Sequence, residues 1–436
     1  MAENNIRTSI GVRLLIIAGL TIILFILMIM GLIKEREFTR DNALKEVSSK
    51  WGNQQTVAGP VLTVPYMFEM KTNENKIVTI TKYAHLLPDH LSINSKLLPE
   101  IRYRGIYEVV LYRTDIQIEG DFLLLELKDL GINDNDVIWK DAFVTIGISD
   151  MRGINDMIEL EWNEKKYTAN SGVYSNDVIT SGVSIKISLI SGKDKYNFST
   201  KINLNGSDRL MFLPVGKTTN VTVRSDWSDP SFTGYYLPDN RKIKSDGFTA
   251  DWEINHLNRN YPQCWIGNKH KIDFSAFGIE LLFPVDQYQK TMRTVKYAIM
   301  FISLTFLAFF MIELLGKKNI HPVQYMLIGF ALLIFYSLLL SLSEHINFTF
   351  AYLISGIAII FIITSYTKSV LRDNRQTGII ACILVILYTY LFVVLQLQDY
   401  ALLIGTMGLL IALALVMYLT RKIDWFSVLN SKTDKT

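Results

Sequence analysis

The sequence contains few of the residues from which most metal and redox sites are built. Its 436 residues include two cysteines and six histidines. Two cysteines cannot supply a four-thiolate zinc site. Cys264 lies in a polar region and Cys382 in an apolar run, so we expect no disulfide between them. The histidines are scattered along the chain, and metal sites need clustered ligands. The sequence therefore predicts neither a bound metal nor a cofactor.

Familiar catalytic and nucleotide-binding motifs are also missing. The chain has no HExxH helix and no GxSxG turn. The segment VGKTT at 215–219 ends like a phosphate-binding loop, but that motif needs a glycine where this chain has Met211. The net charge of +3 gives no basic excess of the kind that nucleic-acid binding needs. We expect a protein that is not an enzyme and has no nucleic-acid partner.

Long apolar runs, in contrast, are abundant, and half of the residues are apolar. One run begins at Pro322, which suits the first position of a helix. It continues for about 20 residues, enough to cross a hydrocarbon core of roughly 30 Å. The polar segment 343–347 interrupts it, and a second run starts at Phe348. So short a connection predicts an antiparallel membrane hairpin.

Six segments of this kind predict six transmembrane helices, one N-terminal and five C-terminal. They cover residues 10–33, 296–315, 323–342, 348–367, 377–396 and 399–419. The first segment also resembles a signal peptide, but its apolar run is longer than the usual 7–15 residues of a signal core. It also lacks a clear cleavage site, so we interpret it as an uncleaved anchor.

Loop charges orient these helices. Lys and Arg gather in three places: 317–318, 368–375 and the tail after residue 420. The loops 343–347 and 396–399 contain neither residue type. By the positive-inside rule both termini are cytoplasmic, and the long segment after the first helix is exported.

The polar middle of the chain, residues 56–292, reads as an extracytoplasmic β-rich domain. Apolar and polar residues alternate along four segments, which is typical of half-buried strands. These are 114–122, 183–190, 197–206 and 220–227. The pattern predicts an all-β, sandwich-like architecture, as one large domain or two stacked ones. The domain boundaries expected from the sequence are 1–33 (anchor), 34–55 (juxtamembrane helix), 56–292 (β domain), 293–420 (five-helix bundle) and 421–436 (tail).

Three smaller features predict contacts within this layout. Leu44, Val47 and Trp51 form a narrow apolar stripe, which predicts that the juxtamembrane helix docks on another surface. Glu313 lies four residues before Lys317 and is expected to pair with it. Small residues at spacing i, i+4 in the last helix predict close packing against a neighbour. They are Ala401 with Gly405 and Gly408 with Ala412.

One polar stripe in the hairpin is a candidate functional site. Ser337, Ser341, Glu344 and His345 share one face at the predicted outer end of their helix. One hypothesis is the mouth of a proton or cation relay, since ionisable residues in membranes are often functional. The alternative is a polar helix end that bonds to neighbouring helices or to the exported domain.

Arg102 and Arg104 form a second candidate, in the segment EIRYRGIYEVVLYRTDIQIEGDF at 100–122. They suit an anionic partner, such as lipopolysaccharide or a cell-wall polymer. Ordinary solvated arginines on a strand pair are the competing interpretation.

Several segments resemble the CreD family of bacterial inner-membrane proteins. The resemblance rests on WGNQQTVAGPVLTVPY at 51–66, LLPDHL at 86–91, IRYRGIYEVVLY at 101–112, LNRNYPQ at 257–263, the stretch 283–315, the hairpin and the stretch 397–426. The middle, about 120–250, is less similar. Family members commonly carry an acidic residue where this chain has Gln398 beside Asp399.

The resemblance implies an inner-membrane protein linked to envelope integrity, colicin tolerance and β-lactam stress. It supplies no catalytic residues. We therefore expect a non-enzymatic envelope protein in contact with the lipid bilayer and with a periplasmic protein or envelope polymer. An ion-coupled transporter or channel using the Ser337–His345 stripe is the alternative. A membrane-embedded hydrolase would need a convergent nucleophile and base, which the helices do not show.

Overall fold

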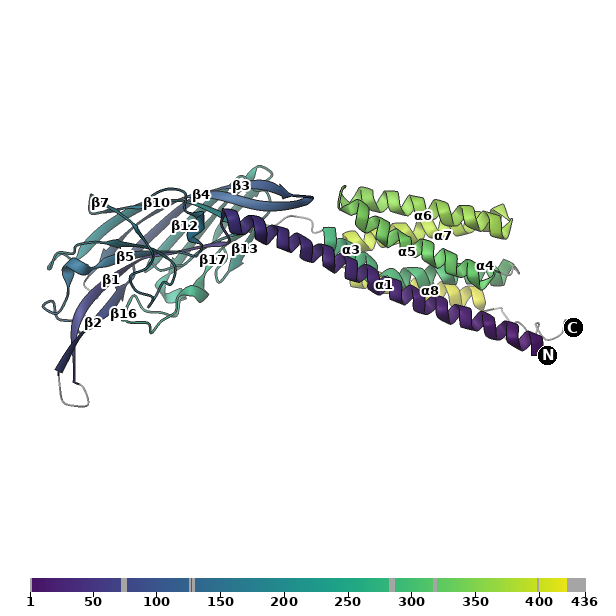
Figure 1. Cartoon of the computed structure of the whole chain (residues 1–436). Coiled ribbons are helices and arrows are strands. Elements are labelled where there is room, and N and C mark those ends of the chain that lie inside the picture. Colours follow the sequence, from purple (N-terminus) through teal and green to yellow (C-terminus); the bar gives the residue numbers. More distant parts are fainter. Residues whose placement is uncertain are drawn as a thin grey trace. The chain divides into compact units, whose positions relative to one another are not determined.

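A computed structural model describes residues 2–71, 77–124, 127, 130–281, 287–316, 320–397 and 400–421. The chain divides into two units (Figure 1). The membrane unit contains Met1–Thr39 and Val285–Thr436, and the β unit contains Arg40–Pro284. The β unit is thus an insertion between the first helix and the remaining helices.

The β unit contains a nine-stranded and an eight-stranded sheet. The nine-stranded sheet has the order β13(Pro230–Gly234), β17(Phe277–Leu281), β11(Arg209–Phe212), β1(Gln55–Lys71), β5(Phe143–Ile148), β9(Gly182–Lys186) and β8(Asn170–Ser171). In addition, β2(Ile77–Leu86) pairs with β1, and β16(Cys264–Ile266) pairs with β2.

The eight-stranded sheet provides the surface on which most candidate residues of the β unit lie. Its order is β14(Asn240–Lys244), β15(Gly247–Asn255), β12(Thr218–Ser225), β3(His90–Arg104), β4(Tyr107–Leu123), β10(Lys195–Ser207), β6(Glu159–Trp162) and β7(Lys165–Thr168). Strands β3 and β12 pair in parallel. Strand β3 pairs antiparallel with β4, and β12 pairs antiparallel with β15.

A single hydrophobic core takes side chains from both sheets. Val57 and Val144 enter it from the nine-stranded sheet, and Ile93, Ile202 and Trp252 enter from the eight-stranded sheet. All five are at most 2% exposed. The β-rich architecture is therefore confirmed, and the two sheets belong to one core rather than to two separate domains.

Alternation located the strands well, with one difference. Residues 197–206 lie in β10, where Phe198, Thr200, Ile202 and Leu204 are buried, as predicted. The segment predicted as a strand over 183–190 leaves the ladder after Lys186. Ile187 and Leu189 stay buried, and their N–H groups donate to the backbone oxygens of Ala142 and Trp139. Alternating burial therefore continues beyond the regular strand.

Helix α1 (Ala2–Trp51) runs without a break through the expected boundary at residue 33. Its C-terminal residues belong to the β unit and dock there, as the stripe predicted. The Trp51 indole N–H donates to the Tyr112 carbonyl at 3.2 Å, and the Arg152 guanidinium donates to the Ser49 carbonyl at 2.7 Å.

The membrane unit contains α3(Gln287–Lys296), α4(Ala298–Gly316), α5(Pro322–Ser343), α6(Phe348–Leu371), α7(Asn374–Gln396) and α8(Ala401–Thr420). Among the described residues, four helices are long and apolar enough to cross a membrane: Pro322–Ser343, Phe348–Leu371, Asn374–Gln396 and Leu403–Thr420. The bent pair Lys290–Lys296 and Ala298–Glu313, with an angle of 46°, makes up to five. The expected sixth span, residues 10–33, lies within α1 and stays a prediction.

The predicted hairpin is confirmed in detail. Pro322 occupies the start of α5, and the His321 side chain caps it by accepting from Val323 N–H. After the connection, the Asn347 side chain accepts from Phe350 N–H and caps α6. A capping side chain satisfies a backbone donor that the helix itself leaves unpaired.

Helix α1 packs in the membrane unit through a stripe of buried isoleucines, each at most 9% exposed. The stripe consists of Ile22, Ile26, Ile29 and Ile33. Their spacing of four, three and four residues keeps one face of the helix toward its neighbours. The next position on this face, three residues after Ile33, is Arg36.

Candidate functional site

Glu344 lies where α5 ends, and it joins three helices of the membrane unit. Its carboxylate lies 3.5 Å from the Arg36 guanidinium of α1 and accepts a hydrogen bond from the Tyr288 hydroxyl of α3 at 3.3 Å. The Glu344 side chain is only 10% exposed, whereas that of Arg36 is 52% exposed. We call Glu344, Arg36 and Tyr288 the connector group.

The positions of these residues in the sequence explain the name. Arg36 lies four residues before the β unit begins at Arg40, and Tyr288 lies four residues after it ends at Pro284. One carboxylate therefore contacts both chain segments that lead to and from the β unit. A largely buried carboxylate without its cationic partner is costly, so this charge favours keeping both segments in place.

The other members of the predicted stripe do not join the connector group. Ser337 is half-buried, and Ser341 and His345 are exposed. None of the three side chains forms a hydrogen bond with another described residue. The structure thus separates Glu344 from the rest of the stripe, and a relay at this position stays a prediction.

The sequence pattern alone did not identify Arg36 and Tyr288 as partners of Glu344. A signal for Arg36 was present, because it continues the α1 stripe one step beyond Ile33. No comparable signal marks Tyr288, since its contact with Glu344 depends on how α3 and α5 pack together.

Glu313 lies near the opposite end of the membrane helices from the α5–α6 connection. Its carboxylate accepts from the Tyr325 hydroxyl at 2.8 Å and from Ile320 N–H at 3.4 Å. The predicted partner Lys317 lies outside the described residues.

Arg102 and Arg104 both contact the C-terminal part of α1 within the β unit. Arg104 forms a two-pronged pair with Glu46, at 3.1 Å from Nη2 to Oε1 and 3.3 Å from Nε to Oε2. A hydrogen bond from Lys50, together with the charge of Arg104, lowers the pKa of Glu46. Arg102 stacks over the Trp51 ring at 4.1 Å and donates to Glu100 at 2.9 Å. An external anion would therefore compete with these internal partners.

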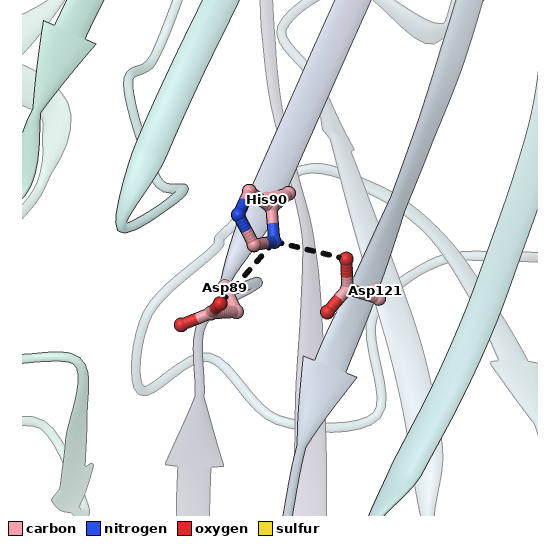
Figure 2. A group of neighbouring side chains, drawn as sticks. All are labelled: Asp89, His90 and Asp121. Carbon is pink, nitrogen blue, oxygen red and sulfur yellow. Dashed lines mark hydrogen bonds and ion pairs between the residues drawn. The ribbon is translucent and has the colours of Figure 1, made fainter.

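One group of side chains has the chemistry of a metal site. Asp89, His90 and Asp121 lie at the end of the β3–β4 pair, with their ligand atoms within 4.8 Å of one another (Figure 2). His90 Nδ1 is 3.2 Å from Asp89 Oδ2 and 3.1 Å from Asp121 Oδ1. Two carboxylates and one imidazole are ligands that zinc or manganese accept.

Two lysines weaken this interpretation. Lys217 Nζ lies 3.5 Å from Asp89 Oδ1, and Lys195 Nζ lies 3.4 Å from Asp121 Oδ2. With His90 bridging the same carboxylates, the negative charge is already balanced by side chains of the domain. Lys217 is also the lysine of the VGKTT segment, so its role here is an ion pair. The group fits a local ion-pair network better than a metal centre.

The interior of the membrane unit contains a cluster of aromatic rings with polar hydroxyls. The Phe335 ring meets those of Tyr352 and Tyr388 at 5.4 and 4.9 Å, and the Tyr352 hydroxyl donates to the Tyr388 carbonyl at 2.8 Å. Within the described part of the chain, the buried hydroxyls of Tyr336, Ser355 and Tyr388 have no hydrogen-bond partner. Buried hydroxyls usually find partners, so these three are exceptions within the described interior of the bundle.

A β-rich unit inserted between membrane-length helices defines a multi-pass membrane protein with a large domain outside the lipid. Residues 9–426 match the family described as "Inner membrane protein CreD". The chain therefore belongs to the CreD family, whose members are inner-membrane proteins.

A curated relative supports this assignment. The chain is similar to "Inner membrane protein CreD" of Escherichia coli (strain K12), with 31% identity over 418 residues. The similarity covers 94% of this chain and 92% of the relative. The resemblance expected from the sequence is confirmed, and the protein is a membrane protein of the cell envelope.

Proposed function

We propose that this chain is a non-enzymatic protein that helps to maintain the bacterial envelope under stress. In this proposal the β unit lies in the periplasm, contacts a partner protein or envelope polymer, and both termini are cytoplasmic. The distribution of loop charges supports the orientation. The described connection between α6 and α7 carries Arg372, and α7 begins with Asn374 and Arg375, whereas the α5–α6 connection has no Lys or Arg.

The observation that carries the proposal is the connector group. Because Glu344 contacts the segments before and after the β unit, a change in either segment alters the same buried carboxylate. Contact between the β unit and a partner is thereby coupled to the packing of α1, α3 and α5. A simple anchor would not need such a link.

The test is the Glu344→Gln variant. It keeps the side-chain shape but removes the charge that attracts Arg36. We expect normal membrane insertion and at least a several-fold loss of complementation in a strain that lacks the gene, measured as survival under β-lactam or colicin stress. The matched control is Glu35→Gln, which changes an exposed glutamate on α1 one residue from Arg36.

A second experiment addresses the membrane helices directly. The β unit is attached to an unrelated single membrane helix and expressed in the same strain. Full complementation by this chimera would show that the helices serve only as an anchor and would contradict the coupling. Equal activity of Glu344→Gln and wild type would contradict the role of the connector group.

The alternative is an ion-coupled transporter or channel that uses Ser337, Ser341, Glu344 and His345. The buried hydroxyls of Tyr336, Ser355 and Tyr388 favour it, since they offer polar groups inside the bundle. Proteoliposomes carrying Glu344→Gln with His345→Ala would show reduced proton or cation flux if the alternative holds. Unchanged flux relative to wild type would remove its main support.

A further inference from the structure

A cleft at one end of the eight-stranded sheet gathers positive charge from three strands. Its volume is about 280 Å³. The cations that line it are Lys96 on β3, Arg224 on β12, and Lys242 and Lys244 on β14. Two carboxylates, Asp226 and Asp246, also line the cleft and leave an excess of two positive charges.

The strand register places these cations side by side. Arg224 is the direct partner of Lys96 in the parallel β3–β12 pair. On its other side Arg224 opposes Thr249, which in turn opposes Lys242. Neighbouring strands lie about 4.8 Å apart, so three cations occupy one row only four strands wide. Like charges opposite one another destabilise a sheet, and Arg224 beside Lys96 is such a pair. Asp115 of β4, on the other side of Lys96, offsets one of the three positive charges and leaves the row with an excess of two.

Carboxylates lie near the four cations without pairing with them: Asp115 of β4 opposes Lys96, and Asp226 and Asp246 line the cleft. Among the residues that the structure describes, none of the four cations forms a salt bridge or a side-chain hydrogen bond. This distinguishes the cleft from Arg102 and Arg104, which are already paired with residues of α1.

Protection of a sheet edge does not explain the whole cluster. Lysines on an edge strand hinder unwanted strand pairing, and β14 is the edge of its sheet. That accounts for Lys242 and Lys244. It does not account for Lys96 and Arg224, because β3 and β12 are interior strands.

The positive charge is also local to this end of the sheet. Four residues away along β3 and β12 lies a row that contains Glu253, Glu119 and Glu161 on β15, β4 and β6. Lys166 of β7 opposes Glu161 in that row, and Asp115 opposes Lys96 in the basic row. Each row therefore carries a net excess of two charges, negative in the first and positive in the second. A generally basic surface would not show this separation.

We infer that this basic cleft binds a phosphate-bearing anion. A multiply charged phosphate or pyrophosphate group matches the excess positive charge, and a guanidinium with surrounding ammonium groups is a common phosphate-binding set. The volume suits a small phosphorylated group. The inference goes beyond the proposed function, because it stands on the cleft alone and does not depend on coupling to the membrane helices.

The test uses the full chain in phosphatidylcholine nanodiscs, titrated with inorganic pyrophosphate by calorimetry. We expect saturable binding that weakens when the salt concentration rises from about 0.05 to about 0.5 M, since exposed charges are screened. The variant Lys96→Gln with Arg224→Gln is expected to weaken binding at least tenfold. The control, Lys166→Gln with Lys201→Gln, removes two exposed lysines from the same sheet outside the cleft and should bind like wild type.

A second arm identifies the source of the phosphate. The same nanodiscs are mixed with phosphatidylglycerol vesicles and separated by flotation. Vesicle binding that pyrophosphate displaces indicates a lipid headgroup, whereas pyrophosphate binding without vesicle binding indicates a soluble phosphate compound. Circular dichroism checks the fold of each variant.

Two results would overturn the inference. One is the absence of saturable binding of both probes to wild type. The other is equal binding by the cleft and control variants, which would make the attraction unspecific. Neither result bears on envelope complementation, which tests the proposed function separately.

Discussion

The Asp150 carboxylate joins Asn53, near the start of the β unit, to Arg152. It accepts four hydrogen bonds, from Asn53 N–H and from the Arg152 backbone and guanidinium groups, at 2.8–3.2 Å. Hydrogen bonds from the Arg152 side chain, the largest cause, together with the Asn53 and Arg152 backbone N–H groups, lower the pKa of Asp150 to about 2. The ionised carboxylate is therefore favoured in the folded state.

This shift predicts how stability depends on pH. A depressed carboxyl pKa stabilises the fold above the usual value of 3.8, and that contribution is lost as the pH falls through about 2. Asp150→Asn should lower the unfolding free energy by about 1 kcal/mol near pH 7. The difference from wild type should disappear near pH 2.

Thermal unfolding followed by near-ultraviolet circular dichroism at several pH values measures this effect. Asp134→Asn, an exposed aspartate in the same unit, is the control. A stability difference that does not change between pH 7 and pH 2 would contradict the assigned cause.

For the candidate residues, the sequence indicated which side chains are polar or charged, but not which other side chains they contact. It identified Glu344 as a polar residue at a helix end, and the structure places it there. It did not show that Arg36 and Tyr288 reach it, because helix rotation and packing decide which side chains meet. Arg102 and Arg104 were likewise visible, but their partners Trp51 and Glu46 are far away in the sequence.

Among the elements, α8 shows the consequence of its small residues most clearly. The Tyr390 hydroxyl of α7 donates to the Ile404 carbonyl at 2.7 Å. A Cβ added at Gly408 would lie only 2.1 Å from that hydroxyl oxygen. A Cβ at Gly405 would meet nothing within 4 Å. Tyr390 therefore leaves no room for a side chain at Gly408, whereas Gly405, whose carbonyl accepts from the same hydroxyl at 3.3 Å, has room for one.

Two substitutions in α8 test this difference. Gly408→Leu should push Tyr390 away and destabilise the contact between α7 and α8 by about 1–3 kcal/mol. Gly405→Leu, in the same helix, should have little effect. The measurement is thermal unfolding in detergent, and equal losses of stability for the two variants would contradict the packing described.

Elements with a strong local pattern were predictable, and their long-range pairing was not. Pro322 and the apolar run after it fixed the start of α5, and alternation located β10. Nothing local indicates that β12 lies parallel to β3, because that pairing depends on the whole sheet. The segment 183–190 shows a further limit, since alternating burial persists where the ladder ends.

For the molecule as a whole, the orientation in the membrane is the property most open to direct test. In a chain whose cysteines are replaced by serine, Ser171→Cys places a thiol on the exposed β8 strand, and Asn374→Cys places one at the exposed start of α7. The proposed orientation predicts that a membrane-impermeant maleimide labels only Ser171→Cys in spheroplasts. Both thiols should react after lysis.

Labelling of Asn374→Cys in intact spheroplasts would reverse the orientation of the helices. Labelling of neither position before lysis would place the β unit in the cytoplasm. The expected result would support both the positive-inside interpretation and the periplasmic location of the β unit.

The parallel pairing of β1 with β11 has a consequence for biogenesis. Gln55 pairs with Leu210, and β11 then pairs with β17, which ends at Leu281. Ribosomes add about 5–20 residues per second, so residues 55–57 wait on the order of ten seconds for β11, whereas residues 62–71 can pair with β2 as soon as it follows. During that interval only this short part of the strand edge lacks its final partner. The nine-stranded sheet is therefore completed in two stages, a first one around β1 and β2 and a later one after β11 and β17 have been synthesised.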